Sequence, residues 1–316
     1  MGGNLFEGSS RLSTEDYHKL YRRFSESSLR SHCIDFELTS SYSSKSSHGD
    51  MDIVICGVED SFYSILEEEF KPTASSFNGN VKSYLIDGFQ VDFIIVSEEE
   101  FDNALLYYSF NDLGNLLGRI TKYYGFTWGH KGLIHEESKL LVSLYPEEIF
   151  RFFNFKNPFF YENELITLNH LFGFVESFTL FDPRFYVWQN RNHEGRHRDK
   201  RRDNYVKFLS KLEETYKNVI KDPLPPCNKE LWLLKALNFF PAFQQRYFQY
   251  QYQQEEKKLI SQKFNGNIVS ELTELKGAEL GKLMKYLKSK DNFDKFILES
   301  DEKTIENWIK ESLTQI

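Results

Sequence analysis

The run His48-Gly49-Asp50-Met51-Asp52-Ile53-Val54-Ile55 constrains the fold and chemistry of this 316-residue chain more than any other feature. It places two carboxylates where a Ser-rich loop becomes an apolar strand. Side chains on a strand alternate between its faces, so Asp50 and Asp52 point the same way. Two acids on one face repel each other unless a cation lies between them. Because Mg²⁺ or Mn²⁺ takes oxygen ligands and keeps part of its shell for phosphate, the pair predicts a metal site built for a nucleotide.

A third carboxylate begins another apolar strand, Gln90-Val91-Asp92-Phe93-Ile94-Ile95-Val96. If this strand pairs beside residues 51–58, Asp92 falls next to the first two acids. Three carboxylates from neighbouring strands can hold two cations, and Asp92 would suit the role of general base. A lone Asp-x-Asp is common without any site. The preceding Gly49, the apolar strand and the third aspartate together favour a site, with phosphoryl or nucleotidyl transfer as its chemistry.

Composition describes an ordinary globular protein, with 40% hydrophobic and 27% charged residues. No stretch approaches the roughly 20 apolar residues of a membrane span, so no membrane partner is expected. The start of the chain lacks an apolar signal region, and three scattered cysteines form no disulfide or zinc pattern, so we expect a cytoplasmic or other intracellular location. A net charge of −8 argues against a surface wholly devoted to nucleic acid, but it permits a local basic strip.

The periodicity predicts a small mixed sheet with helices on one side, followed by a mostly helical region. We expect a helix over 15–30 after a Ser13-Thr14 cap, strands over 33–38, 51–58, 81–86 and 89–96, a helix over 59–70 and a loop over 71–80. Asp87-Gly88 is a strong two-residue hairpin signal. Helices are predicted at 101–108 and 113–124, and a short hairpin at 126–134.

Beyond Pro146 the sequence is almost wholly helical in pattern, interrupted most clearly by Asp222-Pro223-Leu224-Pro225-Pro226. The predicted helices cover 146–155, 162–178, 199–221, 228–247, 250–263, 269–289 and 291–313. The predicted class is therefore α+β. We expect a palm domain at 1–100, a thumb-like nucleotide-binding segment at 101–145 and a helical C-terminal domain at 146–316.

On Gly49-Asp50-x-Asp52 and the distant Asp92, the chain resembles the DNA polymerase beta nucleotidyltransferase superfamily. The resemblance implies a nucleotidyltransferase palm in which Asp50, Asp52 and Asp92 bind metal and act in catalysis, with two Mg²⁺ (or Mn²⁺) ions as cofactors. Its Gly-Ser loop corresponds to Thr39-Ser40-Ser41-Tyr42-Ser43-Ser44, where Ser40 replaces the glycine and Ser41 is the counterpart of the phosphate-binding serine. The usual arginine is replaced by Lys45 as the nearest cation. Gly8-Ser9 lies too far upstream and is expected to be a flexible tail.

The segment from Tyr107 to Arg119, which continues as Tyr124-Gly125-Phe126-Thr127, is similar to family X DNA polymerases. This similarity covers about residues 33–135. It implies that Tyr107 and Tyr108 face the sugar, that Asp112 and Asn115 lie against the incoming base, and that Arg119 reaches the opposite strand. Asp112, Asn115 and Arg119 also share one helix face by their spacing, which suits contacts to base edges and phosphates. The alternative is a solvated face with Asp112 as an N-cap.

One dense basic strip runs from Asn190 to Arg202 beside Tyr186 and Trp188. Arginine beside aromatic residues suits phosphate contact with base stacking, so the strip predicts a nucleic-acid contact. Its candidate residues are Arg191, Arg196, Arg198, Lys200, Arg201 and Arg202. The alternative is that these residues pair with neighbouring Asp and Glu side chains.

The sequence therefore predicts an Mg²⁺-dependent nucleotidyltransferase that adds nucleotides from NTP (ATP included) or dNTP to a nucleic-acid 3′ hydroxyl. DNA, RNA or tRNA could serve as the acceptor. Asn115 and Arg119 favour templated DNA synthesis, whereas the expected lack of a lyase domain and the helical tail favour untemplated RNA or tRNA tailing. A protein-modifying nucleotidyltransferase and a non-catalytic nucleotide-binding module remain alternatives. Base preference and oligomeric state do not follow from the sequence.

Overall fold

The protein is described by a computed structural model that covers residue 3 and residues 5–190 and 193–313. The chain forms two compact units, residues 1–243 and residues 244–316. The boundary lies inside one long helix and was not predicted from the sequence. Within the described residues, no helix has both the length and the apolar character needed to span a membrane.

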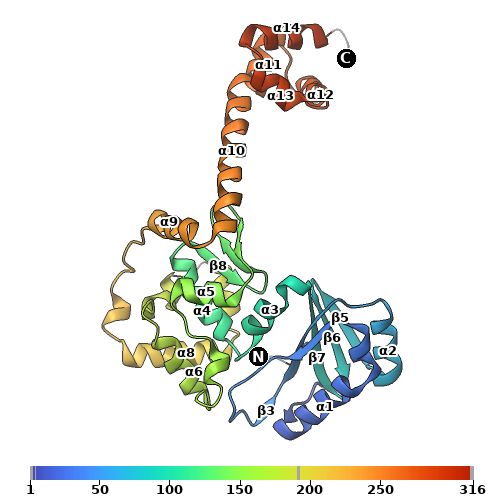
Figure 1. The fold of residues 1–316 in the computed structure, drawn as a ribbon, viewed down its shortest axis with the longest axis vertical. Helices are drawn as coiled ribbons and strands as arrows, with labels where there is room; N and C mark the ends of the chain where they lie inside the picture. Colours follow the sequence, from blue (N-terminus) through green and yellow to red (C-terminus); the bar gives the residue numbers. More distant parts are fainter. Residues whose placement is uncertain (1–2, 4, 191–192, 314–316) are drawn as a thin grey trace. The chain divides into compact units, whose positions relative to one another are not determined.

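The mixed sheet that the sequence predicted forms the first part of the first unit, and it has five strands (Figure 1). In spatial order it contains β2 (Asp35–Leu38), β4 (Asp50–Cys56), β7 (Phe89–Val96), β6 (Val81–Ile86) and β5 (Ala74–Asn78). The β4–β7 pair is parallel and the other pairs are antiparallel. The segment 71–80 was predicted to be a loop, but β5 within it pairs with β6 and forms the edge of the sheet.

The predicted hairpin between β6 and β7 is confirmed. Ile86 pairs with Phe89 across a two-residue loop, and Asp87 and Gly88 have φ values of 52° and 75°. Two positive φ values in a row are the geometry of the hairpin turn that follows the twist of the strands. The turn therefore sets the antiparallel register of β6 and β7.

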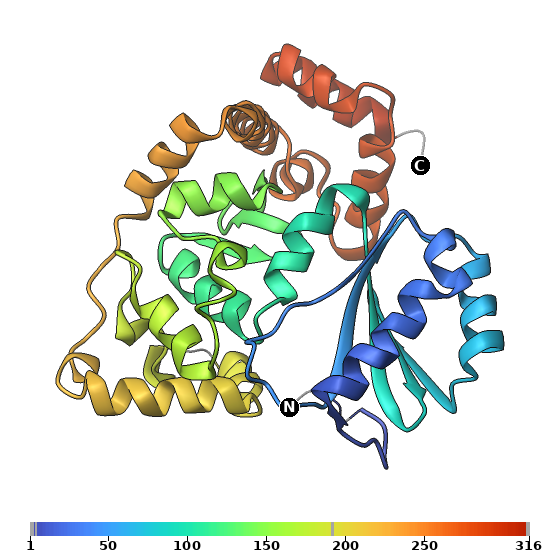
Figure 2. The ribbon, with the colours of Figure 1, turned by 60° about the horizontal axis from the view of Figure 1, so that its bottom comes forward.

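One face of the sheet is closed by α1 (Thr14–Glu26) and α2 (Ser61–Phe70) (Figure 2). The Ser13 hydroxyl accepts the Asp16 N–H, as expected for a cap of α1. The core below these helices is aromatic, with Phe24, Phe62 and Phe93 fully buried. The sequence predicted helices on one side only, but α3 (Phe101–Tyr108) packs on the other face, against Val54, Cys56, Ile94 and Val96.

A small helical subdomain with its own sheet completes the first unit. The strands β8 (Phe126–Gly129), β9 (Gly132–His135) and β10 (Leu141–Ser143) form an antiparallel sheet, of which only the first two were predicted. A two-residue pairing of β1 (Leu12–Ser13) with β3 (Ser47–His48) ties the start of the chain to the loop before β4. The helices are α4 (Leu113–Tyr123), α5 (Pro146–Phe153), α6 (Leu168–Glu176), α7 (His193–Asp199), α8 (Asp203–Thr215) and α9 (Lys229–Phe239).

The second unit holds most of α10 (Pro241–Lys263), which begins where Pro241 ends the preceding helix. The predicted break near residue 248 is therefore wrong. The other helices are α11 (Gly266–Thr273), α12 (Gly277–Lys288), α13 (Phe293–Glu299) and α14 (Glu302–Ser312), so the predicted helices at 269–289 and 291–313 are each divided in two. Val269, Leu283, Ile297 and Ile309 lie in their common apolar core.

Candidate functional site

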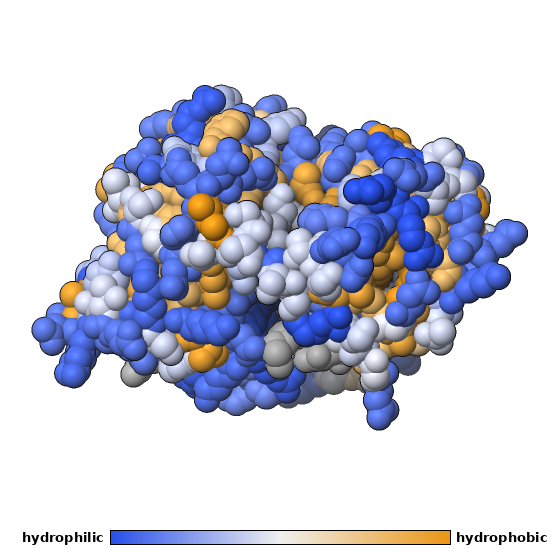
Figure 3. Space-filling view, turned by 90° about the horizontal axis from the view of Figure 1, so that it is seen from below, coloured by the Kyte–Doolittle hydropathy of each residue, from blue (hydrophilic) through white to orange (hydrophobic). Residues whose placement is uncertain are grey.

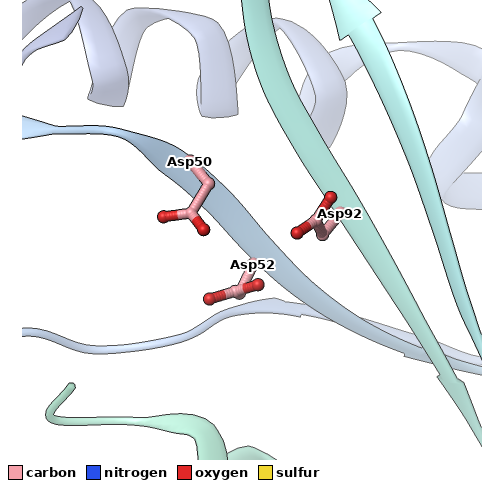
Figure 4. A group of neighbouring side chains, drawn as sticks. All are labelled: Asp50, Asp52 and Asp92. Carbon is pink, nitrogen blue, oxygen red and sulfur yellow. The ribbon is translucent and has the colours of Figure 1, made fainter. Parts of the chain in front are cut away.

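Three carboxylates converge at one end of the β4–β7 pair. Asp52 stands directly opposite Asp92 in the parallel register, and Asp50 lies two residues earlier on the same face of β4. One oxygen from each of the three groups lies within 4.8 Å of the others (Figure 4). The convergence predicted from the sequence is confirmed.

The electrostatics of these acids fit a cation-binding group. Burial, followed by the charges of Asp50 and Asp92, holds the pKa of Asp52 well above its usual value. Burial also raises the pKa values of Asp50 and Asp92, although Lys45 opposes this at Asp50. Three hard oxygen donors that destabilise one another's charge are a donor set suited to Mg²⁺ or Mn²⁺, since a bound divalent ion would remove the repulsion.

A glutamine that the sequence analysis overlooked orients the third acid. The Gln90 Nε2 donates to both carboxylate oxygens of Asp92, at 3.0 and 2.9 Å. Ser83 faces Asp92 from β6, and its hydroxyl lowers the pKa of that carboxyl against the effect of burial. The alternation rule that placed Asp50 beside Asp52 also places Gln90 beside Asp92, so the signal was present in the sequence.

The segment before β1 was expected to be a flexible tail, but it lies against the site. The Ser10 N–H donates to the Gly88 carbonyl at 2.8 Å, and the Leu5 N–H donates to Gln90 Oε1 at 3.1 Å. The Gly3 backbone donates to Asp50. No side-chain pattern marks these contacts, because backbone N–H groups make all three.

An aromatic pair supports the loop that leads into β4. The imidazole of His48 stacks on Tyr17 with ring centroids 3.8 Å apart, and its Nε2 lies 3.2 Å from the Thr14 hydroxyl. Burial, with the nearby Lys45 charge, lowers the pKa of His48 to about 4. His48 is therefore neutral near pH 7 and acts as an aromatic support for Gly49 and Asp50.

A cleft of about 1230 Å³ opens in front of Asp50 and Asp52. A space-filling view shows hydrophilic residues around a hollow on this side of the molecule (Figure 3). On the sheet side the cleft is also lined by Arg11 and Lys45. On the helical side the cleft is lined by the cations Arg198, Arg201, Arg202 and Lys207, by His193 and His197, and by the acids Asp112, Glu194 and Asp203.

The predicted phosphate-binding loop contributes unevenly to this cleft. Lys45 and Gly49 line it, whereas Ser40 and Ser41 are not among its lining residues. The Ser40 N–H donates to the Ser109 hydroxyl at 3.0 Å, and its own hydroxyl donates to Glu162 at 3.4 Å. Ser40 thus joins the loop to the start of the helical region, and the phosphate roles of Ser40 and Ser41 stay predictions.

The residues predicted to face the nucleotide are also divided. Tyr108 and Asp112 line the cleft. Burial, followed by the Tyr107 and Asp52 charges, raises the pKa of Tyr108 to about 12. Tyr107 packs its ring edge-on against Trp128 at 5.4 Å. Its hydroxyphenyl group therefore belongs to the packing beneath Tyr108, and its predicted contact with the sugar is untested.

Arg119 forms a buried ion pair with Asp199 and a hydrogen bond with Asn115. The Arg119 Nη2 lies 2.8 Å from Asp199 Oδ2, with the side chains only 7% and 0% exposed. The same nitrogen donates to the Asn115 Oδ1 at 3.0 Å. This group links α4 to α7, which are 80 residues apart in the chain. The resemblance assigned Asn115 to the incoming base and Arg119 to the opposite strand, but here both side chains bond within the protein.

The basic strip lies partly in the cleft. Arg198, Arg201 and Arg202 line it, Arg196 and Lys200 are not among its lining residues, and Arg191 lies outside the described residues. Arg202 also pairs with Asp112 at 2.6 Å, so the alternative of pairing with nearby acids describes this arginine. Asp112 is the N-cap residue of α4, but its side chain makes no capping hydrogen bond.

Comparisons with known proteins give little similarity. No protein-family model matches the chain. No curated protein matches it either. Among solved structures, the chain is similar to Leishmania infantum polymerase beta in a ternary P/T complex, with 13% sequence identity and a TM-score of 0.33. The match covers 40% of this chain and 59% of that chain, which is less than two thirds of its length.

Proposed function

We propose that this chain is a metal-dependent nucleotidyltransferase that adds a nucleoside monophosphate from NTP or dNTP to the 3′ hydroxyl of a nucleic acid. The observation that carries the proposal is the meeting of three strand-borne carboxylates within 4.8 Å, two of which line a cleft that also has a cationic side. A triphosphate and a nucleic-acid end are both polyanions. Such a cleft would attract both, while the acids supply the ligands for the cations that accompany them.

In this proposal Asp50, Asp52 and Asp92 would hold two Mg²⁺ or Mn²⁺ ions. Bound there, the metal would neutralise phosphate charge and lower the pKa of the attacking hydroxyl. Asp92 accepts the proton of the 3′ hydroxyl, whose oxygen attacks the α-phosphorus. One P–O bond forms, the bond between the α-phosphorus and the bridging oxygen breaks, and pyrophosphate leaves. The raised pKa of Asp92 makes it a better proton acceptor than an ordinary aspartate.

The nucleotide would be bound from three directions. Lys45 and Gly49 line the cleft with the acids and would contact the triphosphate, together with Ser40 and Ser41 in the same loop. Tyr107 and Tyr108 would support the sugar. Asp112 and Asn115 would approach the base from α4.

The acceptor would be held by the basic strip. Arg198, Arg201 and Arg202 line the cleft. Arg191, Arg196 and Lys200 belong to the same basic strip of the sequence and would complete the set. Arg119 is paired with the buried Asp199 instead. Contacts of this kind bind the phosphate backbone without reading its sequence and weaken as salt rises. We therefore expect acceptor affinity to fall steeply between low and moderate ionic strength.

The ion pair of Arg119 favours the untemplated form of this reaction as a second candidate. In templated synthesis the roles assigned to Asn115 and Arg119 require both side chains to contact the nucleotide pair. Arg119 is instead paired with the buried Asp199 and donates to Asn115, and breaking a buried pair leaves an uncompensated charge. An enzyme that tails single-stranded RNA or tRNA needs no such contact.

Extension of labelled acceptors tests the proposal. The full chain would be incubated with Mg²⁺ or Mn²⁺ and each NTP and dNTP, on a primed DNA template, a single-stranded RNA and a tRNA. Lengthening that is lost in Asp52→Asn and Asp92→Asn supports nucleotidyl transfer, and the acceptor that is extended decides between the two candidates.

The other classes give different results in the same reactions. Label that is transferred to protein, with no extension of any nucleic acid, would identify a protein-modifying transferase. Metal-dependent binding of a triphosphate with no transfer to any acceptor would identify a non-catalytic module and contradict the proposed activity.

A further inference from the structure

The start of the chain forms a strap along the acidic end of the sheet. We define the strap as Gly3 and residues 5–10. At its downstream end Ser10 is held twice to the hairpin turn, with its N–H at 2.8 Å and its hydroxyl at 3.0 Å from the Gly88 carbonyl. The chain then enters β1, which pairs with β3 directly before Asp50. The strap is therefore anchored to the turn that leads into β7 and, through β1, to the short strand that leads into β4.

The first contact of the strap is with Asp50. The Gly3 backbone donates a hydrogen bond to this carboxylate and lowers its pKa against the effect of burial. Gly3 is buried and packs so closely that a Cβ there would lie 1.8 Å from the Gly49 carbonyl oxygen. Only a glycine can bring its backbone this close without displacing Gly49, the residue that leads into Asp50.

The second contact reaches Asp92 through Gln90. The Leu5 N–H donates to Gln90 Oε1 at 3.1 Å, and Gln90 Nε2 donates to both Asp92 oxygens. An amide has one accepting end and one donating end. By binding the accepting end, the strap directs the donating end at the carboxylate. If the amide turned over, it would present an oxygen to Asp92 and repel it.

From these two contacts we infer that the strap and Gln90 are positioning residues that arrange Asp50 and Asp92 for divalent-metal binding before the metal arrives. The inference rests on the proposed function, because it concerns the same metal-binding acids. Each contact uses only part of the acceptor capacity of a carboxylate, which leaves lone pairs for an ion. Partners of this kind around a metal site change metal affinity or activity by about 10–100-fold when they are removed.

Mn²⁺ binding to the full-length chain, measured by the electron paramagnetic resonance signal of the free ion, tests the inference without any turnover. The first variant is Gly3→Ala, which would push Gly49 aside. Gly8→Ala is its matched control in the same strap. The two glycines have similar φ values of 83° and 78°, but a Cβ at Gly8 would meet nothing within 4 Å. We expect Mn²⁺ affinity to fall about 10-fold or more in Gly3→Ala and to stay near wild type in Gly8→Ala.

A second variant keeps the test valid if Gly3→Ala folds poorly. Gln90→Met preserves the length of the side chain but removes the donor to Asp92, and we again expect a loss of about 10-fold or more in Mn²⁺ affinity. Raising the Mn²⁺ concentration should restore its activity toward the wild-type kcat, which a general loss of folded protein would not allow. Circular dichroism would verify that each variant is folded.

The outcomes separate this inference from the proposed function. If wild type binds Mn²⁺ and Asp52→Asn does not, while folded Gly3→Ala and Gln90→Met bind as tightly as wild type, the role of the strap is overturned and the metal site stands. If wild type itself binds no Mn²⁺, both proposals fail together. Weakened binding in both variants, with normal binding in Gly8→Ala, supports the strap.

Discussion

The two ends of the β4–β7 pair share one sheet face but differ in chemistry. Near the start of each strand this face carries Asp50, Asp52 and Asp92, and near the end it carries apolar residues, of which Val54 and Ile94 are buried under α3. The backbone pairing is continuous between them. What differs is the covering: a helix seals the apolar end, whereas a cleft leaves the acidic end open. The apolar end therefore stabilises the fold, whereas the buried acids at the other end lower its stability while they are charged and hold no cation.

The largest expected effect is at the acidic end. Asp52→Asn should lower nucleotidyl transfer by at least about 10³-fold, equivalent to about 4 kcal/mol, because the central ligand of the triad is lost. The metal-free variant should be no less stable than wild type, since a buried charge between two other acids is removed. Initial rates and thermal unfolding measure the two quantities. If Asp52→Asn were instead less stable than wild type and its folded fraction were fully active, Asp52 would serve the fold rather than the chemistry.

At the apolar end we expect the opposite result. Ile94→Ala should lower the free energy of unfolding by about 2–5 kcal/mol, because Ile94 is only 2% exposed and leaves a cavity under α3. Urea denaturation measures this loss. The milder control Ile94→Val should cost about 0.5–1.5 kcal/mol. Folded Ile94→Ala should retain metal binding, and a loss of metal affinity larger than the loss of stability would show that the two ends are coupled.

A divalent ion should stabilise the acidic end selectively. At a free Mg²⁺ concentration about 100 times the dissociation constant, the gain in unfolding free energy would be about 2.7 kcal/mol. Thermal unfolding with and without Mg²⁺ should show this gain in wild type and in Ile94→Ala. Asp52→Asn should show no increase in unfolding free energy with Mg²⁺. An increase equal to that of wild type would mean that Mg²⁺ binds at a site other than the three acids.

The last expected effect concerns the support beneath the acids. The pKa of His48 is lowered from 6.5 to about 4 in the folded protein, so the unfolded chain binds more protons between these values. The contribution of His48 to stability should therefore fall as the pH drops from about 6.5 toward 4. His48→Phe keeps the ring against Tyr17 and cannot be protonated, so its unfolding free energy should fall less over this interval. Equal acid sensitivity in both proteins would assign the effect to other groups.

The parts of the fold that follow from local pattern were predictable from the sequence. The alternation around Asp50 and Asp92 identifies their strands, and the Asp87-Gly88 turn fixes the register of β6 with β7, because a two-residue hairpin leaves little freedom of register. The parallel pairing of β4 with β7, which brings the acids together, was a condition of the prediction. The polar edge strand β5 was missed because Ser, Asn and Gly favour loops when no partner strand is known.

Long-range contacts limited the prediction of the site. Arg119 has the spacing of a nucleic-acid contact, but Asp199 binds it from 80 residues away, and no local pattern indicates that pairing. The strap was missed for a different reason. Its contacts with Asp50 and Gln90 come from backbone N–H groups, which every residue other than proline possesses.

The alternation of Asp92 and Phe93 along β7 has a consequence for assembly of the protein in a cell. A shift of the β7 pairing by one residue would turn Phe93 toward solvent at the same moment as it turned the carboxylate into the aromatic interior. A chain with misplaced carboxylates would thus also expose an apolar ring and carry an unpaired interior charge. Chaperones and proteases act on chains with exposed apolar surface, so molecules with misplaced acids would be removed because of their exposed ring.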